Sequence, residues 1–260
     1  GEGRSLVYLG SAAGLAATHA WAIESDLANT RRGTSVATAG DVNGDGFADV
    51  IVGSPRDDGG PGGVDLYLGS ASGLSSTSIW GSTTPNQAGD KFGFSVGTAG
   101  DVNGDGYSDI IIGAYQYNDG QFSAGAAYLY VGSGSGLATV AAWTADGENT
   151  DAGFGVSVAS AGDVNGDGYS DVIVGASSSL GLGKAYLYLG SASGLATTAA
   201  WTVESNQPDS YFGTSVATAG DVNGDGYADV IVGAYYYDNG QLNEGRAYVY
   251  LGSASGLALA

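Results

Sequence analysis

A nine-residue acidic segment that occurs four times dominates this sequence. Its first six residues, Asp-Val-Asn-Gly-Asp-Gly, are identical in every copy and begin at Asp41, Asp101, Asp163 and Asp221. The copies are 60, 62 and 58 residues apart. Such regular spacing predicts a repeat protein in which each unit of about sixty residues is one structural element.

Each acidic segment lies between two runs of β-favouring residues. In the last unit these runs are residues 215–220 and 229–234, and residues 246–251 predict a third strand. A fourth strand is predicted at a tryptophan in four places: Trp21, Trp80, Trp143 and Trp201. Since no helical periodicity accompanies these runs, the sequence predicts an all-β protein, a β-propeller of four-stranded blades, with a solenoid as the rival.

The expected domain is a single propeller, or propeller segment, over residues 1–260. Its repeat units are approximately 1–30 (partial), 31–90, 91–152, 153–210 and 211–260. The first unit lacks its first half and the last unit lacks its fourth strand. The chain therefore provides about four blade equivalents, and the blade at each end is incomplete. Because unpaired strand edges recruit partners, self-association through these ends is expected. The start at Gly1, without an initiator Met or signal peptide, is the pattern of a processed or excised piece.

Charge and composition exclude several classes of partner. The formal charge is −20, which disfavours nucleic acid and anionic membrane surfaces, and no apolar stretch is long enough to span a bilayer. The chain has no cysteine, which excludes thiolate metal sites and thiol catalysis. Twelve of the 27 acidic residues lie in the four repeated segments, where they would repel one another without a cation.

The repeated segment has the oxygen spacing of a calcium loop. Side-chain oxygens stand at positions 1, 3, 5 and 9, a backbone carbonyl is expected at position 7, and glycine at position 6 permits a sharp turn. Hard oxygen donors favour calcium over zinc or copper, and the expected cofactor is four Ca²⁺ ions. The predicted ligands are Asp41, Asn43, Asp45, Phe47 and Asp49; Asp101, Asn103, Asp105, Tyr107 and Asp109; Asp163, Asn165, Asp167, Tyr169 and Asp171; and Asp221, Asn223, Asp225, Tyr227 and Asp229.

Two other interpretations of the segment are weaker. Asp and Asn favour turns without any metal, but that preference explains four identical copies poorly. An EF-hand would require a bidentate glutamate at position 12, where this chain has Val52, Ile112, Val174 and Val232.

The motifs around the segment resemble FG-GAP repeats, as in the integrin α-subunit propeller. Phe-Gly precedes the loop at Phe92, Phe154 and Phe212, and Gly-Ala or Gly-Ser-Pro follows the second strand. The first unit departs from the pattern with Arg32-Gly33, and about four blades stand here where the family usually has seven. The resemblance implies calcium loops on one face of the propeller and extracellular or cell-surface use in adhesion or ligand binding.

No constellation of catalytic residues emerges. His19 is the only histidine and has no counterpart in other units, and Glu24, Glu148 and Glu204 are expected to lie blades apart. The sequence therefore predicts a non-enzymatic module. Its partner is a protein or glycan ligand of unknown identity.

Two alternatives to an adhesion or assembly module stay open. One is a lectin-like propeller, in which a sugar stacks on Tyr115, Tyr117, Tyr235, Tyr236 and Tyr237, although inter-blade packing is the favoured role for these rings. The other is an accessory domain of a larger extracellular hydrolase. The tryptophans are expected in the blade cores.

Overall fold

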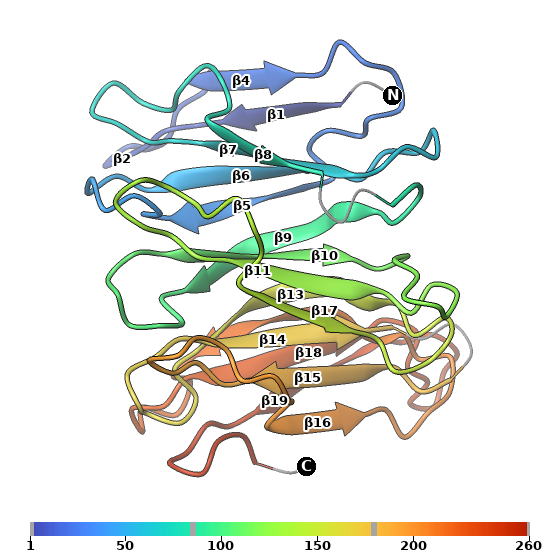
Figure 1. Ribbon diagram of the computed structural model, residues 1–260. Coiled ribbons are helices and arrows are strands. Elements are labelled where there is room, and N and C mark those ends of the chain that lie inside the picture. The colour runs from blue at the N-terminus through green and yellow to red at the C-terminus, as the bar shows by residue number, and fades with distance from the viewer. Residues whose placement is uncertain (1–2, 84–86, 178–180, 259–260) are drawn as a thin grey trace.

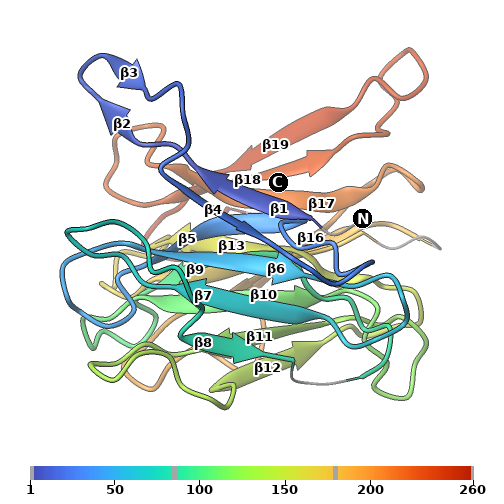
Figure 2. The same ribbon diagram turned by 90° about the horizontal axis from the view of Figure 1, so that it is seen from above.

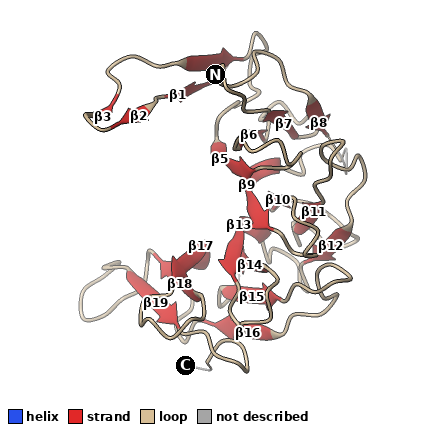
Figure 3. Cartoon of the chain, turned by 90° about the vertical axis from the view of Figure 1, so that its left-hand side faces the viewer, coloured by secondary structure: helices blue, strands red, loops and turns tan. Residues whose placement is uncertain are grey.

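The computed structural model describes residues 3–83, 87–177 and 181–258. Its strands form antiparallel sheets that stand side by side around an open arc (Figures 1 and 3). Three sheets have four strands and follow chain order: β5 (Ser35–Gly40), β6 (Asp49–Ser54), β7 (Gly63–Tyr67) and β8 (Trp80–Ser82); β9 (Phe92–Gly100), β10 (Asp109–Ala114), β11 (Ala126–Tyr130) and β12 (Trp143–Asp146); and β13 (Phe154–Gly162), β14 (Asp171–Ala176), β15 (Lys184–Tyr188) and β16 (Trp201–Glu204). The prediction of four-stranded blades is confirmed.

The two ends of the arc carry incomplete blades, as the sequence predicts. The N-terminal sheet has only β1 (Arg4–Val7) and β4 (Trp21–Glu24), and the C-terminal sheet has β17 (Phe212–Gly220), β18 (Asp229–Ala234) and β19 (Arg246–Tyr250). A small hairpin of β2 (Gly10–Ser11) and β3 (Gly14–Leu15) projects from the N-terminal sheet (Figure 2). The two end sheets lie apart across the opening of the arc (Figure 3).

The core lies between successive sheets. The second strand of each complete blade contributes branched residues such as Ile111 and Ile173, which have no solvent exposure. β-branched side chains favour such strands because they pack well on a pleated surface that is covered on both faces. Three hydrophobic clusters result, each shared by neighbouring blades.

The Phe-Gly motif has a packing role at each blade interface. The phenylalanines are buried and contact a third-strand tyrosine edge to face, as Phe92 does with Tyr128 at a ring-centroid distance of 5.6 Å. The following glycine has φ near +81°, and a Cβ built on Gly113 would lie 1.9 Å from the carbonyl oxygen of Gly155 in the next blade. Backbones of adjacent blades therefore approach as closely as glycine allows.

The tryptophans also connect blades. Trp80, Trp143 and Trp201 are buried, as predicted, but each ring packs on the next blade rather than inside its own. Trp143 stands edge to face with Tyr188 at 4.8 Å, and its Nε1 donates a hydrogen bond to the carbonyl of Ala196 at 2.9 Å. The fourth strand of one blade thus holds the following blade in place. None of the described segments forms a helix with the length and hydropathy that a membrane span requires.

Candidate metal-binding loops

The four acidic segments are the loops that join the first and second strands of their blades, and all four have the same geometry. In the second loop, Oδ1 of Asp101 accepts N–H bonds from Gly104 at 2.7 Å and Asp105 at 3.1 Å, and Oδ2 accepts from Gly106 at 2.8 Å. These bonds curl the backbone around the first aspartate. Gly104 and Gly106 have φ of +74° and +88°, which L side chains adopt only at a cost, so glycine suits both places.

The side chains at positions 3 and 5 lie together at the tip of each loop. Asn103 donates from Nδ2 to Oδ2 of Asp105 at 2.9 Å, and Oδ1 of Asp105 accepts the N–H of Tyr107 at 3.0 Å. The same contacts recur in the other three loops. The N–H of Asp105 donates to both Asp101 and Asn103, so the side chains at positions 1, 3 and 5 lie near one another. Position 5 is exposed in every loop, whereas positions 1 and 3 are half-buried in the first three loops.

The aspartate at position 9 is fully buried and has a structural role that the sequence analysis missed. Oδ2 of Asp109 accepts the N–H of Val102 at 2.9 Å, and Oδ1 accepts the N–H of Gly132, just beyond the third strand, also at 2.9 Å. The equivalent carboxylates in the other blades make the same two bonds: Asp49, Asp171 and Asp229. Each one ties its loop to the neighbouring hairpin.

Burial makes the ionised form of this carboxyl expensive. Desolvation raises the pKa of Asp109 and of Asp171 to about 6, although the two backbone N–H groups oppose the shift. The pKa of Asp49 is raised for the same reason. The pKa of the exposed Asp221 is instead lowered, because its carboxylate accepts a hydrogen bond from the N–H of Gly226.

Among the residues that the structure describes, no cationic side chain pairs with these carboxylates. The ion pairs among the described residues all lie elsewhere, and none includes a loop aspartate. The described residues also contain no group of three or more carboxylate or imidazole side chains gathered closely enough to hold an ion. Positions 1, 3 and 5 are brought together, while the carboxylate at position 9 is directed at backbone N–H groups.

The donor set nevertheless suits a hard cation. Apart from the buried position-9 aspartate, each loop offers two carboxylates that are at least partly accessible, one amide oxygen and one backbone carbonyl, which are the oxygen donors that Ca²⁺ prefers. A carboxylate has about four acceptor positions, so the three N–H bonds to Asp101 leave capacity for a metal. In the second loop the residues that would hold the ion are Asp101, Asn103, Asp105, the carbonyl of Tyr107 and the buried Asp109.

Successive loops interlock along the arc. The carbonyl of Asp41 accepts the N–H of Ser108 in the next loop at 2.9 Å, and the ring of Tyr107 lies against Gly44 of the preceding loop. The second and third loops, and the third and fourth, repeat both contacts. The loops therefore form one continuous row along one edge of the sheets, so order in one loop supports order in the next.

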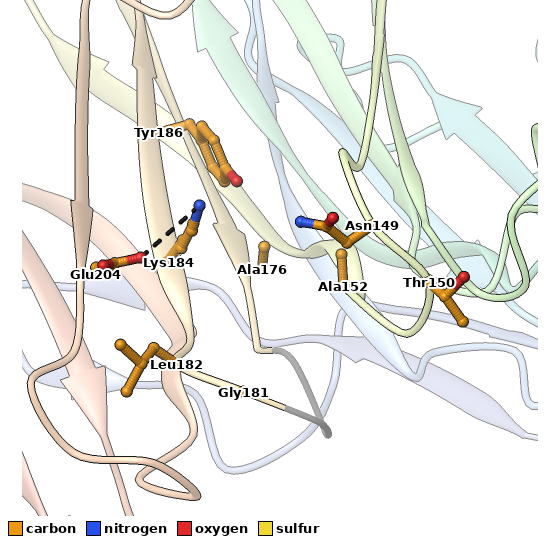
Figure 4. Close-up of a pocket in the computed structure, with 9 residues that line it drawn as sticks. All are labelled: Asn149, Thr150, Ala152, Ala176, Gly181, Leu182, Lys184, Tyr186 and Glu204. Carbon is orange, nitrogen blue, oxygen red and sulfur yellow. Dashed lines mark ion pairs between the residues drawn. The ribbon is translucent and has the colours of Figure 1, made fainter.

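A shallow pocket of about 310 Å³ lies at the opposite end of the third complete blade (Figure 4). Lys184 stands in it and pairs with Glu204 at 3.8 Å and with Glu148 at 3.7 Å. The expectation that these glutamates lie blades apart is therefore wrong for Glu148 and Glu204, because the turn after one blade's fourth strand reaches the third strand of the next. The carboxylates flank an ammonium group, and all three side chains are solvent-accessible.

The tyrosines that follow the second strands divide into three groups. Tyr115 packs at a tilt on Phe94, in the first strand of its own blade, at a ring-centroid distance of 4.6 Å. Tyr117 and Tyr237 pack edge to face on third-strand tyrosines of their own blades, whereas the sequence analysis favours packing between blades. Tyr235 and Tyr236 are nearly half exposed, and together with Tyr211 they form a cluster with centroid distances of 4.4 to 5.3 Å. Of the five tyrosines considered for sugar binding, Tyr235 and Tyr236 are the exposed ones, and exposed aromatic faces suit a sugar-binding surface.

The sheets, the inter-blade glycines and the acidic loops together define an all-β repeat protein with propeller-type blades. The FG-GAP repeat model matches residues 32–67, 92–130, 154–188 and 212–250, which lie within the blades described above. The chain belongs to the FG-GAP repeat family. The resemblance drawn from its motifs is thereby confirmed.

Several integrin α chains are similar to this chain. Integrin alpha-PS2 of Drosophila melanogaster is 33% identical over 229 residues, which cover 79% of this chain and 15% of that protein. Integrin alpha-V of Gallus gallus is 33% identical over a match that covers 85% of this chain and 22% of that protein. Integrin alpha-6 of Homo sapiens is 39% identical over a match that covers 55% of this chain and 12% of that protein. The chain thus spans less than a quarter of each of these relatives.

Among solved structures, an exotype rhamnogalacturonan lyase matches with a TM-score of 0.48 and 17% identity. The match covers 75% of this chain and 37% of the lyase.

Proposed function

We propose that this chain is a calcium-binding, extracellular FG-GAP module that serves in adhesion, ligand binding or assembly and has no catalytic activity of its own. One observation carries the calcium assignment: each loop concentrates three aspartates, one of them fully buried, with no cationic side chain to balance them among the described residues. Burying an unpaired charge is costly, so a bound divalent cation would stabilise the loop.

Calcium would act here as a structural ion. The side chains at positions 3 and 5 already lie together at the loop tip, and binding would fix them relative to the position-1 aspartate and to the buried aspartate that anchors the hairpin. Extracellular modules with such ligands have dissociation constants on the order of 10⁻⁴ to 10⁻³ M, which suits a calcium-rich exterior. The similarity to integrin α chains supports the extracellular and adhesive part of the proposal.

Site-resolved calcium titration tests the assignment. The N–H groups of Gly46, Gly106, Gly168 and Gly226 each donate to the first aspartate of their loop, so their amide NMR resonances report on each loop separately. We expect all four to shift with calcium and much less with magnesium, which demands stricter octahedral geometry.

Two variants sharpen this titration. Asp105→Asn should abolish or strongly weaken the response of Gly106, while the Gly226 response, two blades away, persists. Asp26→Asn, an exposed aspartate outside the loops, is the matched control and should leave all four responses intact. Resonances that do not move at about 10 mM calcium, well above the affinity range of extracellular modules, would refute the assignment.

A glycan-binding role is the second candidate, and the exposed cluster of Tyr211, Tyr235 and Tyr236 favours it. Adjacent aromatic faces of this kind can stack on a sugar ring. A glycan array probed in calcium with the wild-type chain and with Tyr236→Ser tests this role. Binding that the substitution removes would support it, and an array without hits would eliminate it.

A further inference from the structure

The two ends of the arc carry complementary halves of one interface. Within the chain, three junctions join complete or nearly complete blades, and each uses the same contacts. The N–H at loop position 8 donates to the carbonyl at position 1 of the preceding loop: Ser108 to Asp41, Ser170 to Asp101 and Ala228 to Asp163. The N–H of the serine that follows the third strand donates to the carbonyl at position 2 of the preceding loop: Ser133 to Val42, Ser191 to Val102 and Ser253 to Val164. A first-strand valine N–H also donates to a serine Oγ of the preceding blade, as Val96 does to Ser35 at 3.0 Å.

The C-terminal blade presents the accepting half of this interface without a partner. Among the described residues, the carbonyls of Asp221 and Val222 and the Oγ of Ser215 accept no hydrogen bond. A Cβ on Gly224 would meet nothing within 4 Å, although its counterparts in the other loops lie under a tyrosine ring. The side chain of Val222 is 56% exposed, whereas Val42, Val102 and Val164 are fully buried.

The first complete blade presents the donating half. In the part of the chain that the structure describes, the N–H groups of Ala48 and Ser70 donate to no acceptor, while the equivalent groups in later blades bind the preceding loop. Phe47 is equivalent to Tyr107, whose ring covers a glycine of the preceding loop, but the side chain of Phe47 is 41% exposed. Val36 is equivalent to the buried Val96, but its side chain is 57% exposed. Between this blade and the N-terminal sheet lies a cavity of about 420 Å³, lined by Leu6, Trp21, Val36 and Val52.

We propose that the C-terminal blade of one copy of this chain docks against the first complete blade of a second copy, head to tail. The junction would repeat the three internal ones, with Val36 bound to Ser215, Ala48 to Asp221, Ser70 to Val222, and Phe47 over Gly224. Every contact has a counterpart that the chain already makes with itself. A second copy is therefore the occupant whose surface fits both ends.

Charge complementarity indicates how the fourth strand of the C-terminal blade is supplied. In the third complete blade, Lys184 of the third strand lies opposite Glu204 of the fourth and pairs with it at 3.8 Å. Arg246 holds the same place in β19 but has no acidic partner among the described residues. Glu24 holds the matching place in β4, where it pairs at 3.9 Å with Arg4 of β1, the strand that β19 would replace. Strand β4 of the second copy therefore completes the blade, with Glu24 opposite Arg246.

Strands β1 and β19 are copies of the same strand, and only one of them can occupy the third place in the composite blade. Strand β19 pairs with β18 over five residues, and the turn that follows it is anchored by Ser253 and covers Leu257, which is 7% exposed. The turn after β1 projects into solvent, and its Leu15 is 77% exposed. The junction therefore keeps β19 and displaces β1. Each copy then contributes four blades, and two copies make eight, within the range of closed propellers.

Sedimentation velocity and light scattering in calcium test the proposal. Wild type at up to about 100 µM, where a dissociation constant of micromolar order is visible, should run at about twice the monomer mass of 25.7 kDa or at a larger multiple. Val36→Lys blocks the donating face and Ser215→Glu blocks the accepting face, so each variant alone should be monomeric. Val140→Lys, a turn residue that is 75% exposed and belongs to neither face, is the control and should assemble like wild type.

Mixing the two blocked variants distinguishes head-to-tail docking from a symmetric dimer. Each retains one intact face, so an equimolar mixture should recover dimers even though neither variant forms them alone. A mixture that stays monomeric while wild type assembles would overturn the head-to-tail arrangement. A wild-type chain that remains at 25.7 kDa in calcium would overturn the proposal altogether and leave these faces to a further repeat of the same polypeptide.

Discussion

Asp109 and Gly132 are joined by a hydrogen bond of 2.9 Å from the backbone N–H of the glycine to Oδ1 of the buried carboxylate. The other oxygen accepts the N–H of Val102, so one side chain fixes both the start of its loop and the turn after the third strand. This arrangement occurs once per acidic loop. It gives the aspartate at position 9 a structural role whether or not a metal is bound.

Asp109→Asn should therefore destabilise the protein even in chelator. An amide has only one oxygen, so one of the two buried N–H groups would face an NH₂ group instead of an acceptor, at a cost of about 1–3 kcal/mol. Urea unfolding in EDTA measures the loss. Asp105→Asn, at the exposed tip of the same loop, is the control and should change stability in EDTA by less than about 0.5 kcal/mol. Equal losses in the two variants would contradict the role assigned to Asp109.

Gly113→Ala should be strongly destabilising because its Cβ would lie 1.9 Å from the carbonyl oxygen of Gly155 in the next blade. Relieving that overlap requires two backbones to separate, and overpacking of this kind costs about 1–3 kcal/mol or more. Gly63→Ala is the matched control, since the nearest atoms to its Cβ are 3.8 Å away in its own blade. Thermal unfolding of the two variants should differ clearly, and similar melting temperatures would argue against close blade contact.

Asp90 should make the stability of the protein depend on pH. Burial raises the pKa of this carboxyl, although the N–H groups of Phe92 and Gly62 oppose the shift. Because the folded pKa lies above the unfolded value of about 3.9, the stabilisation is complete below that value and is lost as pH rises through the folded pKa.

The comparison of wild type with Asp90→Asn isolates this effect. The free energy of unfolding of wild type, relative to the variant, should fall between about pH 4 and neutral pH. Urea unfolding in EDTA at several pH values measures it, because titration of the loop carboxylates is common to both proteins and cancels. A difference that stays constant, or that grows with pH, would show that the carboxyl is not held in its protonated form.

Much of the fold could be predicted from the sequence because each unit repeats the same local pattern. The periodic acidic segment, the branched second strand and the tryptophan of the fourth strand locate the four-stranded blades and both incomplete ends. These features are local, and their spacing alone carries the information.

Contacts between units could not be predicted in the same way. The hydrogen bond from Ser108 to Asp41, the ring of Tyr107 on Gly44 and the approach of Glu148 to Lys184 all depend on the angle between neighbouring sheets. Sequence spacing does not encode that angle. The tryptophans illustrate the difference, since their burial was predictable but the blade they pack against was not.

The position-7 residues show a second limit. Phe47 and Tyr107 are predicted as ligands through their backbone carbonyls, and no side-chain role follows from that. In the structure the ring of Tyr107 covers Gly44 of the preceding loop, while Phe47 covers no loop glycine among the described residues and is 41% exposed. The same position thus has two environments, and only the arrangement of the ends distinguishes them.

Thermal unfolding in calcium and in chelator tests the central claim most directly, because the claim is that four cations neutralise the acidic loops and stabilise the blades. Each site should contribute about 1.4 kcal/mol when calcium is at ten times its dissociation constant, so the melting temperature should rise steadily with calcium concentration. Magnesium at equal ionic strength should reproduce little of this rise. Superimposable unfolding curves in calcium and in EDTA would contradict the account.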